Sequence, residues 1–208
     1  NAATGTLNLN FTGTPGITTL TATASGNTVN YGFAGTQTVF STNYHHLTLS
    51  NSGVKTLQTG TTAIGGNLTL SGTASTTGVI GLTIGGSVTI GSGTTFTGGP
   101  FTHNVAGNWI NNGGTFTNTG STINFNGGTT SLLTAGASSF STLAISNNTT
   151  LRPQTNTLTA ATITIASGST LDMATNNIAL TVNTTLTNSG TVNVGTGAVS
   201  IPNASSGN

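Results

Sequence analysis

Very few side chains in this chain of 208 residues could do acid–base or nucleophilic chemistry. The ionisable candidates are Lys55, Arg152, Asp172, His45, His46 and His103. Glycoside hydrolysis usually requires two carboxylates, and Asp172 alone cannot supply a pair within one chain. A Ser-His-Asp arrangement through Asp172 lacks a G-x-S-x-G nucleophile elbow. We therefore predict no catalytic residue and no enzymatic activity, with Asp172 in or beside a turn.

The histidines do not have the spacing of a metal site. His45 and His46 are adjacent, so in a strand their side chains point to opposite faces, and His103 lies far along the chain. Calcium requires several oxygen ligands, usually carboxylates, which this chain lacks. The sequence therefore predicts no metal ligands and no cofactor.

The composition of the chain excludes nucleic acid as a partner and excludes a membrane span. Charged residues make up 1% of the chain, against about 25% in an ordinary soluble domain. Nucleic-acid binding requires many Lys and Arg side chains to neutralise phosphates. No apolar run approaches the 18 residues of a membrane span. A net charge of +1 instead favours self-association, so a homopolymer is the expected partner.

Short segments in which apolar residues alternate with Thr must position any site. This period-two pattern indicates strands with one buried face, and Thr suits the exposed face because it is β-branched. Gly, Asn and Ser clusters, which are turn signals, separate the segments. Examples are Leu47–Leu49, Leu68–Leu70, Leu82–Ile84, Val88–Ile90, Ile163–Ile165 and Leu180–Val182.

The strand segments recur about every 20 residues, as the spacing of Leu47, Leu68, Val88 and Trp109 shows. Such a period is typical of one coil in a stack of repeats. We predict an all-β fold, a single-stranded parallel β-solenoid (β-helix) with ~20–22 residues per coil. An antiparallel β-sandwich has the same local alternation and stays open as the alternative.

A longer repeat divides the chain. Val29–Tyr31 matches Ile123–Phe125, and Tyr44–Leu49 matches Phe140–Ile145, at offsets of about 94 to 96 residues. We interpret residues 27–121 as solenoid module 1 and residues 122–208 as module 2 with a C-terminal cap. Residues 1–26 form an N-terminal cap or donor strand in this interpretation.

Several phrases resemble the β-strand repeats of large bacterial surface and adhesin-like proteins. The similarity covers most of residues 27–171, and it implies a secreted, surface-exposed β-helix without implying an activity. The phrases that carry it are Val29–Tyr31, Gln37–Val39, Tyr44–Leu49, Lys55–Leu57, Gly66–Leu70, Gly107–Phe116 and Ile123–Gly127. We therefore expect an extracellular or cell-surface location.

Two surface features could bind a ligand. Trp109 is the candidate platform for a glycan, because its counterpart in the first module is not aromatic. Outward Thr arrays on flat β-helix faces suit ice binding, and Thr-x-Thr pairs occur at Thr21 and Thr23 and at Thr162 and Thr164. The possible glycosylation sequons are Asn10, Asn67, Asn147, Asn148, Asn183 and Asn203.

The ends of the predicted rod direct the functional hypothesis. A solenoid has two open ends with unpaired backbone groups, and neither end of this chain carries a charged side chain. We predict a structural subunit of an extracellular filament, sheath or adhesive surface layer. A strand containing Leu7, Leu9 and Phe11 is the candidate subunit contact. An adhesin-type module that binds glycans or a surface, and an ice-binding protein, are the alternatives.

Overall fold

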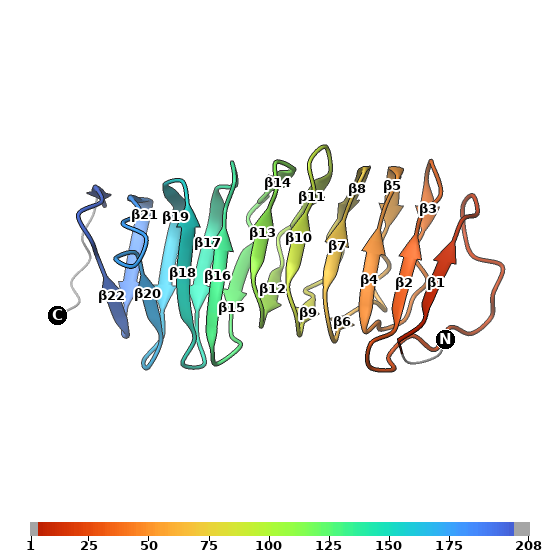
Figure 1. The fold of residues 1–208 in the computed structure, drawn as a ribbon, viewed down its shortest axis with the longest axis horizontal. Coiled ribbons are helices and arrows are strands. Elements are labelled where there is room, and N and C mark those ends of the chain that lie inside the picture. The colour runs from red at the N-terminus through yellow and green to blue at the C-terminus, as the bar shows by residue number, and fades with distance from the viewer. Residues whose placement is uncertain (1–3, 202–208) are drawn as a thin grey trace.

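A computed structural model describes residues 4–201, and these residues form an all-β rod without helices (Figure 1). The chain winds through ten coils, from β1 at one end to β22 at the other. Every pair of strands in residues 4–201 is parallel. The predicted parallel β-solenoid is therefore confirmed, and the antiparallel β-sandwich is excluded. Residues 4–201 contain no helix that is long and apolar enough to cross a membrane.

One sheet runs the whole length of the rod and receives one strand from every coil. Its strands are β1 (Thr6–Leu9), β2 (Thr28–Tyr31), β4 (His46–Leu49), β7 (Leu68–Leu70), β10 (Val88–Ile90), β13 (Trp109–Asn111), β16 (Thr130–Thr134), β18 (Thr150–Thr155), β20 (Thr170–Asp172) and β22 (Thr191–Asn193).

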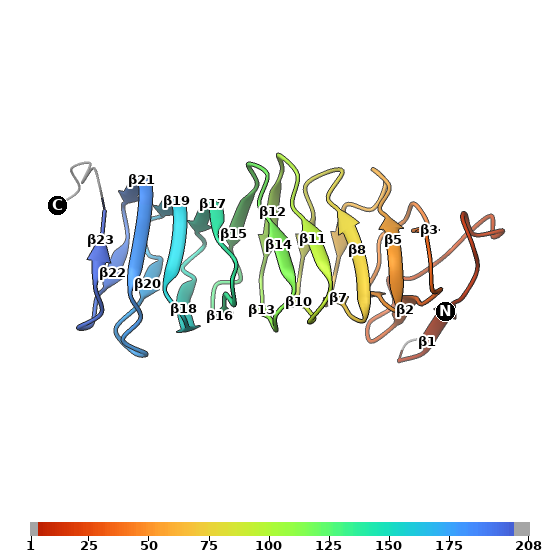
Figure 2. The same ribbon diagram turned by 90° about the horizontal axis from the view of Figure 1, so that it is seen from above.

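Two further sheets complete the walls of the solenoid, and Figure 2 shows them from above. The five-stranded sheet contains β3 (Gln37–Thr38), β5 (Ser52–Thr56), β8 (Thr73–Thr77), β11 (Thr95–Thr97) and β14 (Thr115–Thr117). The eight-stranded sheet contains β6 (Ala63–Ile64), β9 (Thr83–Ile84), β12 (Thr102–Val105), β15 (Thr122–Phe125), β17 (Phe140–Ile145), β19 (Leu158–Ile165), β21 (Leu180–Asn188) and β23 (Val199–Ser200).

Alternation of side chains builds a continuous core along the axis. Apolar residues of successive coils pair directly with one another and stack inside the long sheet, where burial of their side chains stabilises the stack. One such inward column consists of Leu7, Val29, Leu47, Leu68, Val88, Trp109 and Leu133. All of its members except Leu7 are fully buried, so a coil buries its apolar face only against its neighbours.

The coils differ in length more than the predicted 20–22 residues. Paired residues lie 18 positions apart from Val29 to Leu47 and 24 apart from Trp109 to Leu133. The corners absorb the difference with left-handed turns. Gly72, for example, has φ 69°, and a Cβ there would collide with the carbonyl of Asn51 in the coil before.

The cross-section changes two thirds of the way along the rod. The five-stranded sheet ends at β14, and after β16 the chain passes directly to β17 in the eight-stranded sheet. Val29–Tyr31 lies in the long sheet, whereas its sequence match Ile123–Phe125 lies in the eight-stranded sheet. The matched segments thus have different positions in the coil, and the division into two modules stays a prediction.

Candidate functional site

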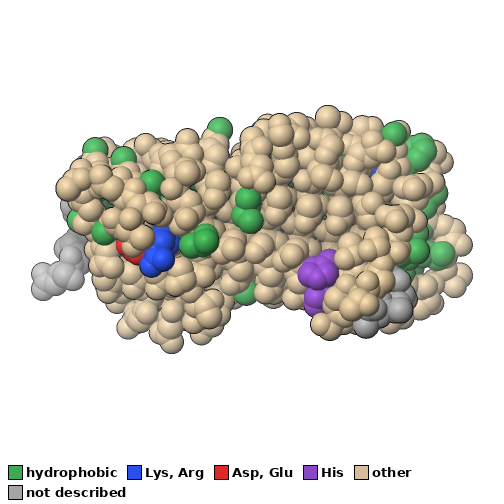
Figure 3. All heavy atoms as spheres, in the orientation of Figure 1, with side chains coloured by type: hydrophobic (Ala, Val, Ile, Leu, Met, Phe, Trp, Pro, Cys, Tyr) green, Lys and Arg blue, Asp and Glu red, His purple; other side chains and the backbone are tan. Residues whose placement is uncertain are grey.

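The charged side chains do not form one site. Lys55 is buried in the third coil, whereas Arg152 and Asp172 lie on later coils, and Figure 3 shows the latter pair well separated from a surface cluster of histidine. Within residues 4–201, no group of three His, Cys, Asp or Glu side chains could hold a metal ion. The ionisable side chains therefore make separate contacts at different places along the rod.

Lys55 is fully buried, which sequence reasoning missed. Its Nζ donates to Phe33 O at 2.5 Å, Gly35 O at 2.9 Å and Gln37 Oε1 at 3.0 Å, so all three ammonium protons have acceptors. Burial lowers the pKa of Lys55 below its usual value. The side chain joins the second and third coils from inside. The sequence did contain a signal for this burial. Lys55 lies midway between Gly53 and Leu57, and residues at every second position of a strand face the same side.

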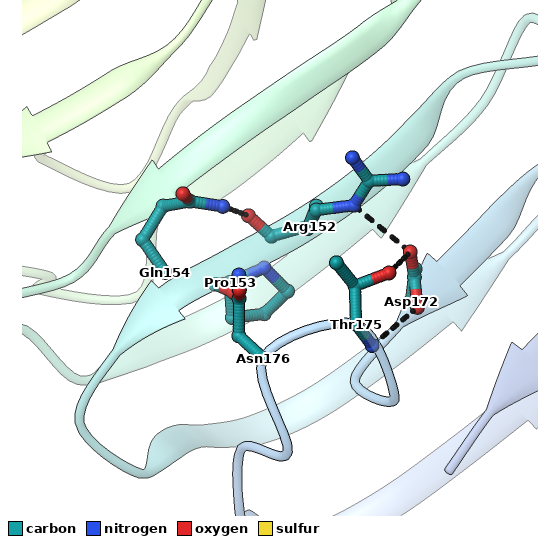
Figure 4. A network of polar contacts seen from close by, with 6 residues as sticks. All are labelled: Arg152, Pro153, Gln154, Asp172, Thr175 and Asn176. Carbon is teal, nitrogen blue, oxygen red and sulfur yellow. Dashed lines mark hydrogen bonds and ion pairs between the residues drawn. The ribbon is translucent and has the colours of Figure 1, made fainter. Parts of the chain in front are cut away.

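Arg152 and Asp172 form an ion pair across two neighbouring coils (Figure 4). Arg152 Nε donates to Asp172 Oδ2 at 2.9 Å, and Thr175 donates to the same carboxylate from its hydroxyl at 2.6 Å and from its backbone N–H at 3.1 Å. Burial raises the pKa of Asp172, but the hydrogen bonds from Thr175 and Arg152 outweigh it, so the pKa lies below its usual value. The pair fixes a turn beside the long sheet.

The three histidines bind backbone groups of neighbouring coils. The rings of His45 and His46 are 4.2 Å apart and nearly perpendicular. His45 accepts a hydrogen bond from Gly26 N in the coil before, and His46 accepts one from Asn67 N in the coil after. His103 is buried beside the Phe96 ring, and its Nε2 lies 2.7 Å from Gly98 O. Each imidazole is thus occupied with a structural contact.

Trp109 does not form a surface platform, and that prediction is wrong. Its side chain is fully buried in the inward column of the long sheet and contacts the rings of Phe96, Phe116 and Phe140 at centroid distances of 4.8 to 6.3 Å. The aromatic cluster fills the core where the five-stranded sheet ends. The even spacing of Leu68, Val88 and Trp109 already placed the indole in a buried column.

The candidate contact strand lies at the N-terminal end of the rod. β1 pairs with β2 on one edge, and its other edge has no strand partner within residues 4–201. Leu7, Leu9 and Phe11 are half-buried and pack against the core, and Phe11 stacks edge-on against Tyr31. Because β1 already belongs to the first coil, it presents an edge instead of a free strand for donation.

The C-terminal end has the same character. Ile178, Leu186, Val192 and Ile201 are partly buried against the core, and Val194 and Val199 are 54% and 45% exposed. Val194 extends the inward side of β22, where Val192 pairs with Leu171. Among residues 4–201, both ends therefore expose apolar, inward-facing side chains beside a strand edge that has no partner strand.

The predicted sequons lie on the surface where they are described. Asn10, Asn67, Asn147, Asn148 and Asn183 are all exposed, and Asn203 lies outside the described residues. Glycosylation of these side chains stays a prediction.

Paired threonines form a regular patch on the five-stranded sheet. Strands β8, β11 and β14 are in register, so their outward side chains make two columns of three. The members of this threonine patch are Ser75, Thr77, Thr95, Thr97, Thr115 and Thr117. Five further threonines pair along the eight-stranded sheet, namely Thr102, Thr122, Thr142, Thr162 and Thr185.

Comparisons with protein-family models, curated proteins and solved structures found no match.

Proposed function

We propose that the protein is a structural subunit of an extracellular filament, sheath or adhesive surface layer, in which the solenoids stack end to end. The observation that carries this proposal is the pair of uncharged, apolar ends. Leu7, at the start of the inward column, and Val194, at the far end, are both partly exposed. A second copy would cover each of them as the next coil does elsewhere.

The polarity of the chain makes such an interface head-to-tail. All strands are parallel, so the β22 edge of one copy and the β1 edge of the next can pair in the same direction. A head-to-tail contact that does not close into a ring generates an open filament. Charged side chains normally protect exposed edges from such pairing, and neither end carries one. Extracellular location is part of the proposal, supported by the low charge and the repeat phrases.

Electron microscopy of the purified protein at neutral pH and low salt tests assembly. We expect fibres with a subunit repeat of about 50 Å, because ten coils stack at ~4.8 Å each. Val194→Lys should abolish them, because it places a charge in the interface. Val54→Lys is the matched control: Val54 is 48% exposed but lies on a side wall, so this variant should still polymerise. Fibres of equal length from both variants would contradict end-to-end stacking.

Ice binding is a second candidate, and the threonine patch favours it. In the patch, hydroxyl and methyl groups repeat every ~4.8 Å between coils and about 7 Å along each strand. No charged side chain belongs to strands β8, β11 or β14. A rigid array of this kind can order water on one plane. The glycan-binding alternative has lost its candidate residue, because Trp109 is buried.

Thermal hysteresis measurements decide this second candidate. Thr97 lies in the middle strand of the patch, so Thr97→Lys should remove most of the hysteresis. Thr59→Lys, at an exposed corner outside the patch, should leave it unchanged. Absence of hysteresis and of ice-crystal shaping in the unmodified protein would exclude ice binding.

A further inference from the structure

All three histidines accept a backbone N–H from a neighbouring coil through Nδ1. Gly26 N donates to His45 at 3.2 Å, Asn67 N to His46 at 2.9 Å and Leu82 N to His103 at 3.3 Å. A peptide N–H can only donate, so each Nδ1 must lack a proton. The three hydrogen bonds therefore require neutral imidazoles.

The contact at His46 is the first step of a series that runs along one corner of the solenoid. In the next coils, Ser87 N donates to Asn67 Oδ1 at 2.9 Å, Asn108 N to Ser87 Oγ at 3.0 Å and Leu132 N to Asn108 Oδ1 at 2.8 Å. We call His46, Asn67, Ser87 and Asn108 the corner ladder. Asn and Ser do not titrate in the accessible pH range, so His46 is its only ionisable member.

The histidine pair, His45 and His46, occupies the N-terminal end of this series. His45 reaches back to Gly26, just before β2, and His46 reaches forward to Asn67, just before β7. Two adjacent residues thus connect the corners of the coils before and after their own. The coils nearest the N-terminus are held at this corner by imidazole, and the following coils are held by amide or hydroxyl oxygens.

We propose that the histidine pair is an acid-sensitive contact that controls the attachment of the N-terminal coils, residues 4–45, to the rest of the rod. Protonation converts Nδ1 from an acceptor into a donor that faces another donor, so both hydrogen bonds are lost. The remaining members of the corner ladder keep their bonds. Acid therefore loosens the end that carries β1, while the corner ladder from Asn67 onward keeps its bonds.

The surroundings of the pair contain no compensating charge within the described residues. The two imidazole rings lie edge to face with their centroids 4.2 Å apart. Tyr44, the residue before them, is buried, and its hydroxyl bonds to Tyr31 and to Phe40 O. Lys55 faces Phe33, Gly35 and Gln37, and the Arg152–Asp172 ion pair lies on later coils. Burial, and then the charge of His45, lower the pKa of His46 below its usual value.

The direction of the pH effect follows from linkage. Because the pKa of His46 is lower in the folded chain, the loosened chain binds the proton first. The contact is fully stabilising above the usual histidine pKa of about 6.5 and is lost as the pH falls below it. At pH 5, one histidine can shift the opening equilibrium by up to about 30-fold.

Hydrogen exchange resolved by peptide, at pH 7.5 and 5.0 and corrected for intrinsic rates, tests the proposal. Protection of residues 4–45 should fall at least tenfold at pH 5.0, whereas residues 140–165 should change little. The His45→Asn/His46→Asn variant is the matched comparison, because Asn supplies an oxygen at ladder positions 67 and 108. It should keep its protection at both pH values. Equal loss in the variant, or no loss in the unmodified protein, would overturn the proposal.

A second measurement does not depend on the variant. In an NMR titration of the unmodified protein, the His46 imidazole should stay neutral down to pH 6 while the N-terminal coils are protected. A protonated His46 ring in a fully protected chain would refute the acid-sensitive contact.

The consequence for assembly rests on the proposed function. If the end with β1 is a subunit interface, fibres formed at pH 7.5 should dissociate at pH 5.0. Absence of fibres at both pH values would contradict the proposed function, while the exchange data would still decide the histidine contact by themselves.

Discussion

At the scale of single residues, inward-facing polar side chains hold particular coils together. Lys55 is the clearest case, because its three acceptors belong to the coil before its own and lie inside the wall. Without the ammonium group, Gly35 O would lose its bond to Lys55 beside a fully buried position, whereas Phe33 O would keep the N–H of Gly35 at 3.0 Å and Gln37 Oε1 the N–H of Phe33 at 2.9 Å. An unsatisfied buried acceptor costs about 1–3 kcal/mol.

We therefore expect Lys55→Met to lower the free energy of unfolding by about 1–3 kcal/mol. Urea unfolding followed by circular dichroism measures the change. Arg152→Met is the comparison, since it removes the other cation, whose side chain is 34% exposed. Because Asp172 keeps both hydrogen bonds from Thr175 in this variant, the loss of the partly exposed arginine should cost only about 0–1 kcal/mol. Equal losses of stability in the two variants would contradict the prediction that the buried ammonium of Lys55 contributes more to the free energy of unfolding than the Arg152 guanidinium.

The sequence predicted individual residues well where their spacing defined a column. The alternation around Leu47, Leu68 and Val88 predicted burial of these side chains correctly. Trp109 follows the same spacing and is buried, so the surface position predicted from its aromatic character is wrong. Lys55 shows the opposite difficulty. Charge normally indicates exposure, and only the acceptors of the preceding coil, distant in sequence, make its burial possible.

At the scale of elements, period-two segments indicated strands, but they did not indicate which wall each strand belongs to. Thr95–Thr97 and Thr115–Thr117 are short, and only their pairing shows that they form one patch. Such pairing depends on corner lengths, which vary because coils differ by up to six residues, from 18 to 24. The loss of the five-stranded sheet after β14 has the same origin, since the corner after β16 turns directly into β17.

At the scale of the whole molecule, the registers of successive coils determine how two rods would meet. Thr6 pairs with Thr28, and Thr28 pairs with His46, at the start of the corner ladder. Further along the same outward side, Leu132 pairs with Arg152, and Asp172 pairs with Asn193. This outward column therefore runs from Thr6 to Asn193. If a second rod continues the stack, Asn193 of one copy lies beside Thr6 of the next.

This register predicts a specific covalent link. Neighbouring parallel strands are ~4.8 Å apart, which lies within the Cα separation of about 4.4–6.8 Å that a disulfide spans. The chain contains no cysteine, so Thr6→Cys and Asn193→Cys introduce the only thiols. Mild oxidation of the double variant should give a ladder of covalent multimers on a denaturing gel without reductant.

The two single-cysteine variants are the controls, because a chain with one thiol can form no covalent species larger than a dimer. A pair at Thr6 and Asn183 is the second comparison: Asn183 is also exposed, but it belongs to β21 in the eight-stranded sheet, away from the end of the long sheet. Only the Thr6 and Asn193 pair should produce species beyond the dimer at low protein concentration. Multimers of equal length from both pairs would mean that the rods associate without a defined register, and dimers alone would mean that the two ends do not meet.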